Sequence, residues 1–190
     1  VKDVPVYHKD VTTWEVSDKD GKQLGILYMD FFPREGKKGG AWMTSYRKQK
    51  TVDGKRIAPI ISIVCNFTKP TANTPSLLTF DEASTFFHEF GHALHGLLSN
   101  VKYESLSGTS VPTDFVELPS QIMENWAAEP EVLKLYAKHY KTGETIPDAL
   151  IEKMQNAGTF DQGFATVEYL AAAYLDMDYH ARTEPVTQNI

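Results

Sequence analysis

Residues 79–98 read Thr79-Phe-Asp-Glu-Ala-Ser-Thr-Phe-Phe-His-Glu-Phe-Gly-His-Ala-Leu-His-Gly-Leu-Leu98, and this stretch decides how the rest of the chain is organised. Its apolar residues recur at intervals of three and four, which is typical of one face of an amphipathic helix. Thr79 or Asp81 is a candidate N-cap, because each has a side-chain oxygen that can accept a backbone N–H. We expect a helix that follows this cap and ends near Ser99-Asn100.

Within this helix, His88 and His92 are four positions apart, so both imidazoles lie on one face, one turn apart. Glu89 lies on the adjacent side. This arrangement suits a zinc ion beside a carboxylate that can take a proton from water. We therefore predict His88 and His92 as metal ligands and Glu89 as the general base. The alternative is two surface histidines satisfied by hydrogen bonds and a solvated acid.

A catalytic zinc with two histidines usually takes a third ligand that is a carboxylate, and Glu117 is the candidate. It lies in the first turn of a second expected helix, from about Phe115 to Ala128. The alternative for Glu117 is an acid that only favours a helix N-terminus. Glu124 follows two turns later on the same face. We predict that it accepts a ring N–H from a ligand histidine and fixes the orientation of that ring.

His95 is the rival ligand, since it follows His92 by three positions. However, His88 and His95 are about 10.5 Å apart along a helix axis at ~1.5 Å per residue, too far to share one small ion easily. We predict a hydrogen-bonded role for His95 behind the ligands or in the cleft. His8, His139 and His180 lie outside the motif and are expected to be surface or locally hydrogen-bonded residues.

Alternating apolar residues give the first third of the chain strand character. Two of the expected strands, at 12–16 and 24–32, form a hairpin. Two more, at 41–46 and 57–67, are joined through a turn at Asp53-Gly54. Helices are expected at about 130–141, 147–157 and 160–181. Pro130 and Pro147 mark the starts of the first two, and Gly158 separates the second from the third.

The predicted fold class is α+β and mostly helical: a small antiparallel sheet followed by a zinc-binding helix pair and further helices. Its parts are a sheet-rich region at 1–70, the zinc-binding helices at 80–128 and a helical region at 130–190.

The 190 residues carry a formal net charge of −6, which argues against a nucleic-acid partner. The one basic cluster, Arg34 to Lys38, is expected to be a solvated loop, with a phosphate or substrate carboxylate contact as the alternative. The single cysteine, Cys65, is expected to pack as a small hydrophobic residue. No run approaches the roughly 18 apolar residues of a membrane span, so no membrane association is predicted. The predicted compartment is the cytoplasm, with the periplasm as the alternative.

With these residues in view, the chain resembles the thimet oligopeptidase and peptidyl-dipeptidase family of zinc peptidases over nearly its whole length. Within that family it looks most like the bacterial peptidyl-dipeptidases. The resemblance is carried by Gly39 to Met43, Val64 to Phe67, Phe86 to His95, Leu106 to Thr109 and Asp114 to Gln121.

The resemblance implies a Zn²⁺ ion held by His88, His92 and Glu117, with Glu89 as the base, and short peptides as substrates. It implies that a strand near 60–67 pairs with substrate, and that Gly108 and Thr109 border the substrate cleft. Family members are several times longer. The tyrosine-rich segment that assists at the scissile carbonyl is therefore expected beyond Ile190. This chain is expected to be the catalytic core of a larger enzyme. Without the remainder of that enzyme, its turnover is expected to be poor.

The predicted function is zinc-dependent hydrolysis of short peptides that releases C-terminal dipeptides. One alternative is an oligoendopeptidase of the same family. The other is a non-catalytic module in which zinc only joins two helices, but a closed site of that kind would want a fourth protein ligand, and Cys65 lies in an apolar strand.

Overall fold

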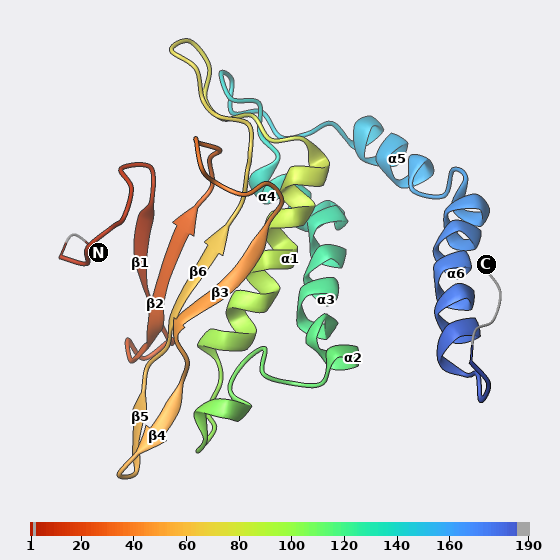
Figure 1. Ribbon diagram of the computed structural model, residues 1–190. Coiled ribbons are helices and arrows are strands. Elements are labelled where there is room, and N and C mark those ends of the chain that lie inside the picture. Colours follow the sequence, from red (N-terminus) through yellow and green to blue (C-terminus); the bar gives the residue numbers. More distant parts are fainter. Residues whose placement is uncertain (2, 186–190) are drawn as a thin grey trace. The chain divides into compact units, whose positions relative to one another are not determined.

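A computed structural model describes residue 1 and residues 3–185 of the chain (Figure 1). The chain divides into two compact units, Val1–Glu144 and Thr145–Ile190, and each is described by itself. The first unit combines a β-sheet with helices, and the second contains helices α5 (Asp148–Ala157) and α6 (Gln162–His180). The predicted α+β class is confirmed.

A four-stranded sheet forms one layer of the first unit, in the order β1-β2-β6-β3 (Figure 1). The strands are β1 (Thr12–Ser17), β2 (Gln23–Asp30), β3 (Trp42–Arg47) and β6 (Ile60–Val64). The β1–β2 hairpin and the β3–β6 pair are antiparallel as predicted, whereas β2 and β6 are parallel. The sheet is therefore mixed, because the chain places β3 at the far edge before β6 returns between β2 and β3.

A second, two-stranded ribbon joins β4 (Lys50–Val52) to β5 (Lys55–Ile57). Its turn is the predicted one, with φ of 49° at Asp53 and 74° at Gly54, both in the left-handed region that this hairpin turn requires. The strand predicted at 57–67 is interrupted. Pro59 separates β5 from β6, since a proline has no N–H for a ladder hydrogen bond.

Helix α1 (Phe80–Leu97) begins where the sequence predicted. The Thr79 hydroxyl accepts the Glu82 N–H at 3.2 Å, and the Glu82 carboxylate accepts the Thr79 N–H at 2.9 Å, which together form a capping box. The Glu82 carboxylate also accepts the Thr68 N–H at 2.8 Å, so the start of α1 is tied to the segment that follows the sheet.

The core lies between α1 and the sheet. Leu27, Ile61 and Ile63 from the sheet pack with Ala93 and Leu97 from α1, each at most 1% exposed. Burial of such side chains is the main favourable term in folding. Cys65 is fully buried in the same cluster, as predicted, and its burial raises the pKa of the thiol to about 12.

The second predicted helix of the metal site is divided in two, α2 (Thr113–Val116) and α3 (Leu118–Ala128), with Glu117 at the junction. Pro119 explains the break, because it has no N–H to continue the hydrogen bonds of α2. Helix α4 (Pro130–Tyr136) is shorter than the predicted 130–141, since the backbone leaves the helical region at Ala137. A short 3₁₀ helix, η1 (Glu104–Leu106), lies in the preceding loop.

The basic cluster at 34–38 is not simply a solvated loop, and that prediction was wrong for two of its residues. Arg34 makes two hydrogen bonds to the Asp30 carboxylate, at 2.7 and 2.8 Å. The Lys37 side chain is only 4% exposed and its Nζ donates to the same carboxylate at 3.0 Å. Asp30 is itself 1% exposed at the end of β2. A buried carboxylate requires such partners, and this one takes them from the basic loop.

No helix within the described residues is long and apolar enough to cross a membrane.

Candidate metal centre

Helices α1 and α3 pack closely enough for their backbones to touch, and Gly91 makes this possible. A Cβ at Gly91 would lie 2.5 Å from the Pro119 carbonyl oxygen and 2.6 Å from the Ser120 Cα. Glycine is the residue that permits such an approach of two backbones. This approach places Glu117, at the junction of α2 and α3, and Glu124 of α3 next to the histidines of α1.

His88, His92 and Glu117 come together at this contact. Glu117 Oε2 lies 3.2 Å from His88 Nε2 and 3.0 Å from His92 Nε2, and one ligand atom from each of the three residues lies within 4.8 Å of the others. Ser120 Oγ donates to the same Glu117 oxygen at 2.6 Å. That hydrogen bond lowers the pKa of Glu117. The site thus contains an ionised carboxylate facing two imidazoles.

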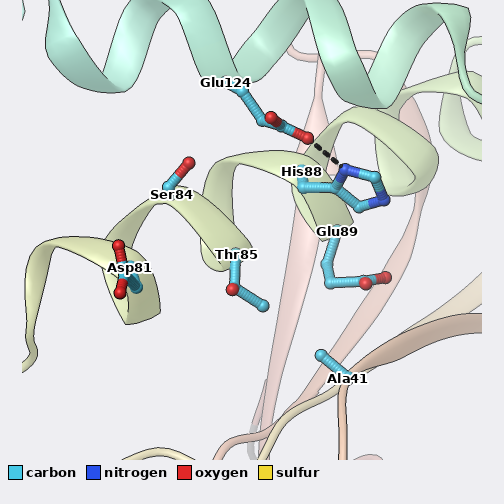
Figure 2. A pocket seen from close by; sticks show the side chains of 7 residues that line it. All are labelled: Ala41, Asp81, Ser84, Thr85, His88, Glu89 and Glu124. Atoms are coloured by element: carbon cyan, nitrogen blue, oxygen red, sulfur yellow. Dashed lines mark hydrogen bonds and ion pairs between the residues drawn. The ribbon is translucent and has the colours of Figure 1, made fainter. Parts of the chain in front are cut away.

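Glu124 determines which nitrogen of His88 carries the proton. Its Oε1 lies 2.5 Å from His88 Nδ1, and Figure 2 shows Glu124 reaching from α3 to this ring. Because a carboxylate accepts, the proton of a neutral His88 is on Nδ1, and Nε2 turns its lone pair toward Glu117. With a neutral His88, two acceptors then face each other, an arrangement that a metal ion between them would stabilise.

The donor set fits a zinc ion. Burial lowers the pKa of His92, which is 9% exposed, so its imidazole is neutral and able to bind a metal. Ligand atoms around a tetrahedral zinc with bonds of about 2.1 Å are separated by roughly 3.4 Å. The distances of 3.0 and 3.2 Å from Glu117 Oε2 to the two histidine nitrogens are close to that value. Two imidazoles and one carboxylate also leave a fourth position for water.

Glu89 lies beside the cluster without being part of it. It is 5% exposed, and its Oε2 has no hydrogen-bond partner among the described residues. Burial raises the pKa of this carboxyl. A buried acid with a free oxygen and a raised pKa next to a metal site is suited to accept a proton.

Two pockets adjoin at Glu89, and Ala41, His88 and Glu89 line both. The first has a volume of about 430 Å³. The second, of about 310 Å³, contains the metal-site residues. Besides the three shared residues, the second is lined by Trp42, Met43, His92, Thr109, Val116 and Glu117.

The structure places the other predicted site residues as follows. Thr109 lines the second pocket, whereas Gly108, with φ of 57°, packs against the backbone of Gly96 on α1. His95 has no hydrogen bond to the cluster among the described residues. Its Nδ1 is buried without a partner and its ring lies 6.2 Å from that of Phe115. His8, His139 and His180 each make local hydrogen bonds, as predicted.

The prediction that the strand near 60–67 pairs with substrate was wrong. Strand β6 hydrogen-bonds to β2 on one side and to β3 on the other, so it has no free edge. The edge strand next to β6 is β3, and its first residues, Trp42 and Met43, line the second pocket together with the preceding Ala41. A strand at 41–46 was predicted from local alternation, but its place at the edge of the sheet was not, because strand order depends on contacts between distant residues.

Comparison with known proteins places the chain in a family of peptidases. The sequence pattern described as "Peptidase family M3" matches residues 1–189. The chain belongs to peptidase family M3. It is 50% identical over 182 residues to the dipeptidyl carboxypeptidase of Escherichia coli, which is 96% of this chain and 26% of that protein. It is 42% identical over 186 residues to oligopeptidase A of the same species, which is 97% of this chain and 27% of that protein.

The chain is also 40% identical over 190 residues to the thimet-like oligopeptidase of Dictyostelium discoideum, which is 94% of this chain and 28% of that protein. The chain thus spans about a quarter of the length of the curated relatives it matches. The predicted family is confirmed.

Proposed function

We propose that this chain carries the catalytic zinc site of a peptidase that hydrolyses short peptides and releases dipeptides from their C-terminus. The observation that carries the proposal is the convergence of His88 and His92 Nε2 on Glu117 Oε2, beside the buried, unpartnered oxygen of Glu89. The similarity to dipeptidyl carboxypeptidase supports dipeptide release. Similarity to oligopeptidase A makes internal cleavage of short peptides the second candidate.

The roles of the residues follow from their positions. His88, His92 and Glu117 would hold one Zn²⁺, and Glu124 keeps the His88 proton on Nδ1. When bound there, zinc acts as a Lewis acid that favours hydroxide over water and polarises the peptide carbonyl. Glu89 accepts the proton of the attacking water at its free oxygen. It then returns this proton to the leaving amine as the C–N bond breaks.

The position of the substrate is proposed from the edge of the sheet. Strand β3 has one unpaired side, and its first residues line the pocket that holds the metal site. An extended peptide can add to such an edge through main-chain hydrogen bonds. Thr109 borders the same pocket, and Gly108 allows its loop to lie against α1.

A purely structural zinc site is the competing function. Within the described residues, the group able to hold a metal has three members, and Cys65 is buried in the core instead. Closed structural sites usually take four protein ligands. The open position and the adjacent Glu89 therefore favour catalysis.

Glu89→Gln tests the proposal, because it removes the base while keeping the shape of the side chain. We expect one zinc per chain in both proteins and a fall of about 10²- to 10⁴-fold in the hydrolysis rate of an N-acylated peptide. Products are identified by mass spectrometry at high protein concentration, so that slow turnover is detected. Equal rates in the two proteins would refute Glu89 as the base.

A further inference from the structure

The first pocket, of about 430 Å³, extends from Glu89 along the first turns of α1 (Figure 2). Its volume is within the range of about 300–1,000 Å³ that is typical of ligand sites. Besides the three residues shared with the second pocket, it is lined by Asp81, Ser84, Thr85 and Glu124. None of the functions described so far uses Asp81, Ser84 or Thr85.

These three side chains have polar groups without partners. Neither the Asp81 carboxylate nor the hydroxyls of Ser84 and Thr85 make a hydrogen bond or ion pair with another described residue. Helical serine and threonine often donate to the carbonyl four residues earlier, and these two do not. The capping of α1 is performed by Thr79 and Glu82, so Asp81 is not needed for it.

The pocket is also acidic. Asp81, Glu89 and Glu124 contribute three carboxylates, and the lining contains no lysine or arginine. Glu89 is the most informative of the three, because its Oε2 is buried and has no partner among the described residues. A buried unpaired carboxylate oxygen is unfavourable unless a donor reaches it. The pocket therefore offers acceptors and negative charge to a ligand that brings several N–H groups.

A second metal ion does not fit this description. Across the described part of the chain, the group of His, Cys, Asp and Glu whose ligand atoms lie within 4.8 Å of one another is His88, His92 and Glu117. Asp81, Glu89 and Glu124 do not form such a group. Carboxylates that are spread along a pocket suit an extended cation, such as an ammonium or guanidinium group on an aliphatic stem.

We propose that this pocket is a specificity subsite for a lysine or arginine side chain of the peptide substrate. The inference rests on the proposed peptidase function, because it uses the position of the pocket directly beside Glu89 and His88. Asp81 and the two hydroxyls receive the cationic end of the side chain. The stem lies along α1 next to Ala41, so a basic residue is bound close to the scissile bond.

The test is binding of matched fluorescent peptides to the zinc-loaded chain, measured by anisotropy. The peptides differ in one residue, lysine or norleucine, which is moved through each position in turn. We expect one position at which lysine binds more tightly than norleucine. Asp81→Asn reduces this preference by about threefold to fivefold, the range for one partly exposed charge pair. Thr85→Val, which replaces the hydroxyl with a methyl group, reduces it in the same direction.

The matched control is Glu131→Gln, which removes one negative charge from the exposed face of α4, outside both pockets. It should leave the preference unchanged. Equal binding of lysine and norleucine peptides at every position, no peptide binding at all, or equal effects of the Asp81 and Glu131 variants would each overturn the subsite. None of these results alters the zinc content or the effect of Glu89→Gln, so a failure of the subsite is distinguishable from a failure of the peptidase function.

Discussion

Among the single residues, Glu124 is important for the proposed metal site although it is not one of the proposed ligands. It contacts His88 Nδ1 and not the side of the ring that faces Glu117. A carboxylate in this position orients the ring and makes the other nitrogen more basic. We therefore expect the zinc affinity of the site to depend on Glu124, through its contact with His88.

Glu124→Ala should weaken zinc binding about 10- to 100-fold, because His88 loses the acceptor that fixes its tautomer. The affinity is measured by competition with a chromophoric chelator. Glu131→Gln on α4 serves as the control for the loss of one charge. An unchanged zinc affinity in the Glu124 variant would show that the contact does not orient the ligand.

Asp30 gives a prediction about pH. Burial alone would raise its pKa, but hydrogen bonds from Arg34 and Lys37 outweigh this effect and lower the pKa from 3.8 to about 2. A carboxylate with a lowered pKa stabilises the fold above its unfolded pKa, and this stabilisation disappears as the pH falls toward the folded value. The part that depends on pH amounts to about 2 kcal/mol.

Urea unfolding of the wild-type chain should therefore show a loss of stability between about pH 4 and pH 2, to which Asp30 contributes. Asp30→Asn should be less stable at pH 7, because the buried Lys37 ammonium loses the one carboxylate that forms an ion pair with it in the described structure. The difference between the two proteins should shrink as the pH falls through this range. A difference that stays constant with pH would mean that Asp30 does not act through its charge.

At the scale of elements, the contact between α1 and α3 is the feature that assembles the site. Gly91→Ala places a methyl group 2.5 Å from the Pro119 carbonyl oxygen, so α3 has to move. We expect a loss of roughly 1–3 kcal/mol in the free energy of unfolding, as for other overpacked contacts. Zinc affinity should fall as well, because Glu117 moves away with α3.

The matched control is Gly163→Ala, at the start of α6, where a Cβ would meet nothing within 4 Å. It should be neutral or stabilising by up to about 1 kcal/mol, since alanine favours helices. Both variants are compared by urea unfolding and by chelator competition. If Gly91→Ala kept full zinc affinity and stability, close backbone contact would not be needed to form the site.

The elements themselves were largely predictable where the determining residues are close in sequence. Thr79 and Glu82 define the start of α1 through a local capping box, and Asp53-Gly54 defines the turn between β4 and β5. The break at Glu117 was missed although its signal, Pro119, was visible in the sequence. The shorter α4 was missed because no glycine or proline marks its end at Tyr136.

At the scale of the whole molecule, predictability falls because strand order depends on contacts between distant residues. The alternating pattern identified β2 and β6 but contained nothing to indicate their parallel pairing. The free edge at β3 follows from that order, which is why the substrate-pairing strand was predicted wrongly. The burial of Lys37 also depends on tertiary contacts, with Asp30 and the Cys65 carbonyl.

The candidate metal site was more predictable than the sheet, since helical spacing places His88, Glu89 and His92 by itself. Glu117 was predicted from the ligand preference of zinc, and Glu124 from its place two turns later on the same helix face. The structure brings both to the histidines. Ala41, Trp42 and Met43 were not predicted, because only the folded sheet places them in the pocket.

The zinc content of the 190-residue chain, measured by elemental mass spectrometry after dialysis against metal-free buffer, tests the proposed metal site most directly. We expect close to one zinc per chain in the wild type and in Glu89→Gln, and almost none in His92→Ala. Wild-type protein without zinc, or full zinc content in His92→Ala, would contradict the assignment of His88, His92 and Glu117 as the metal site.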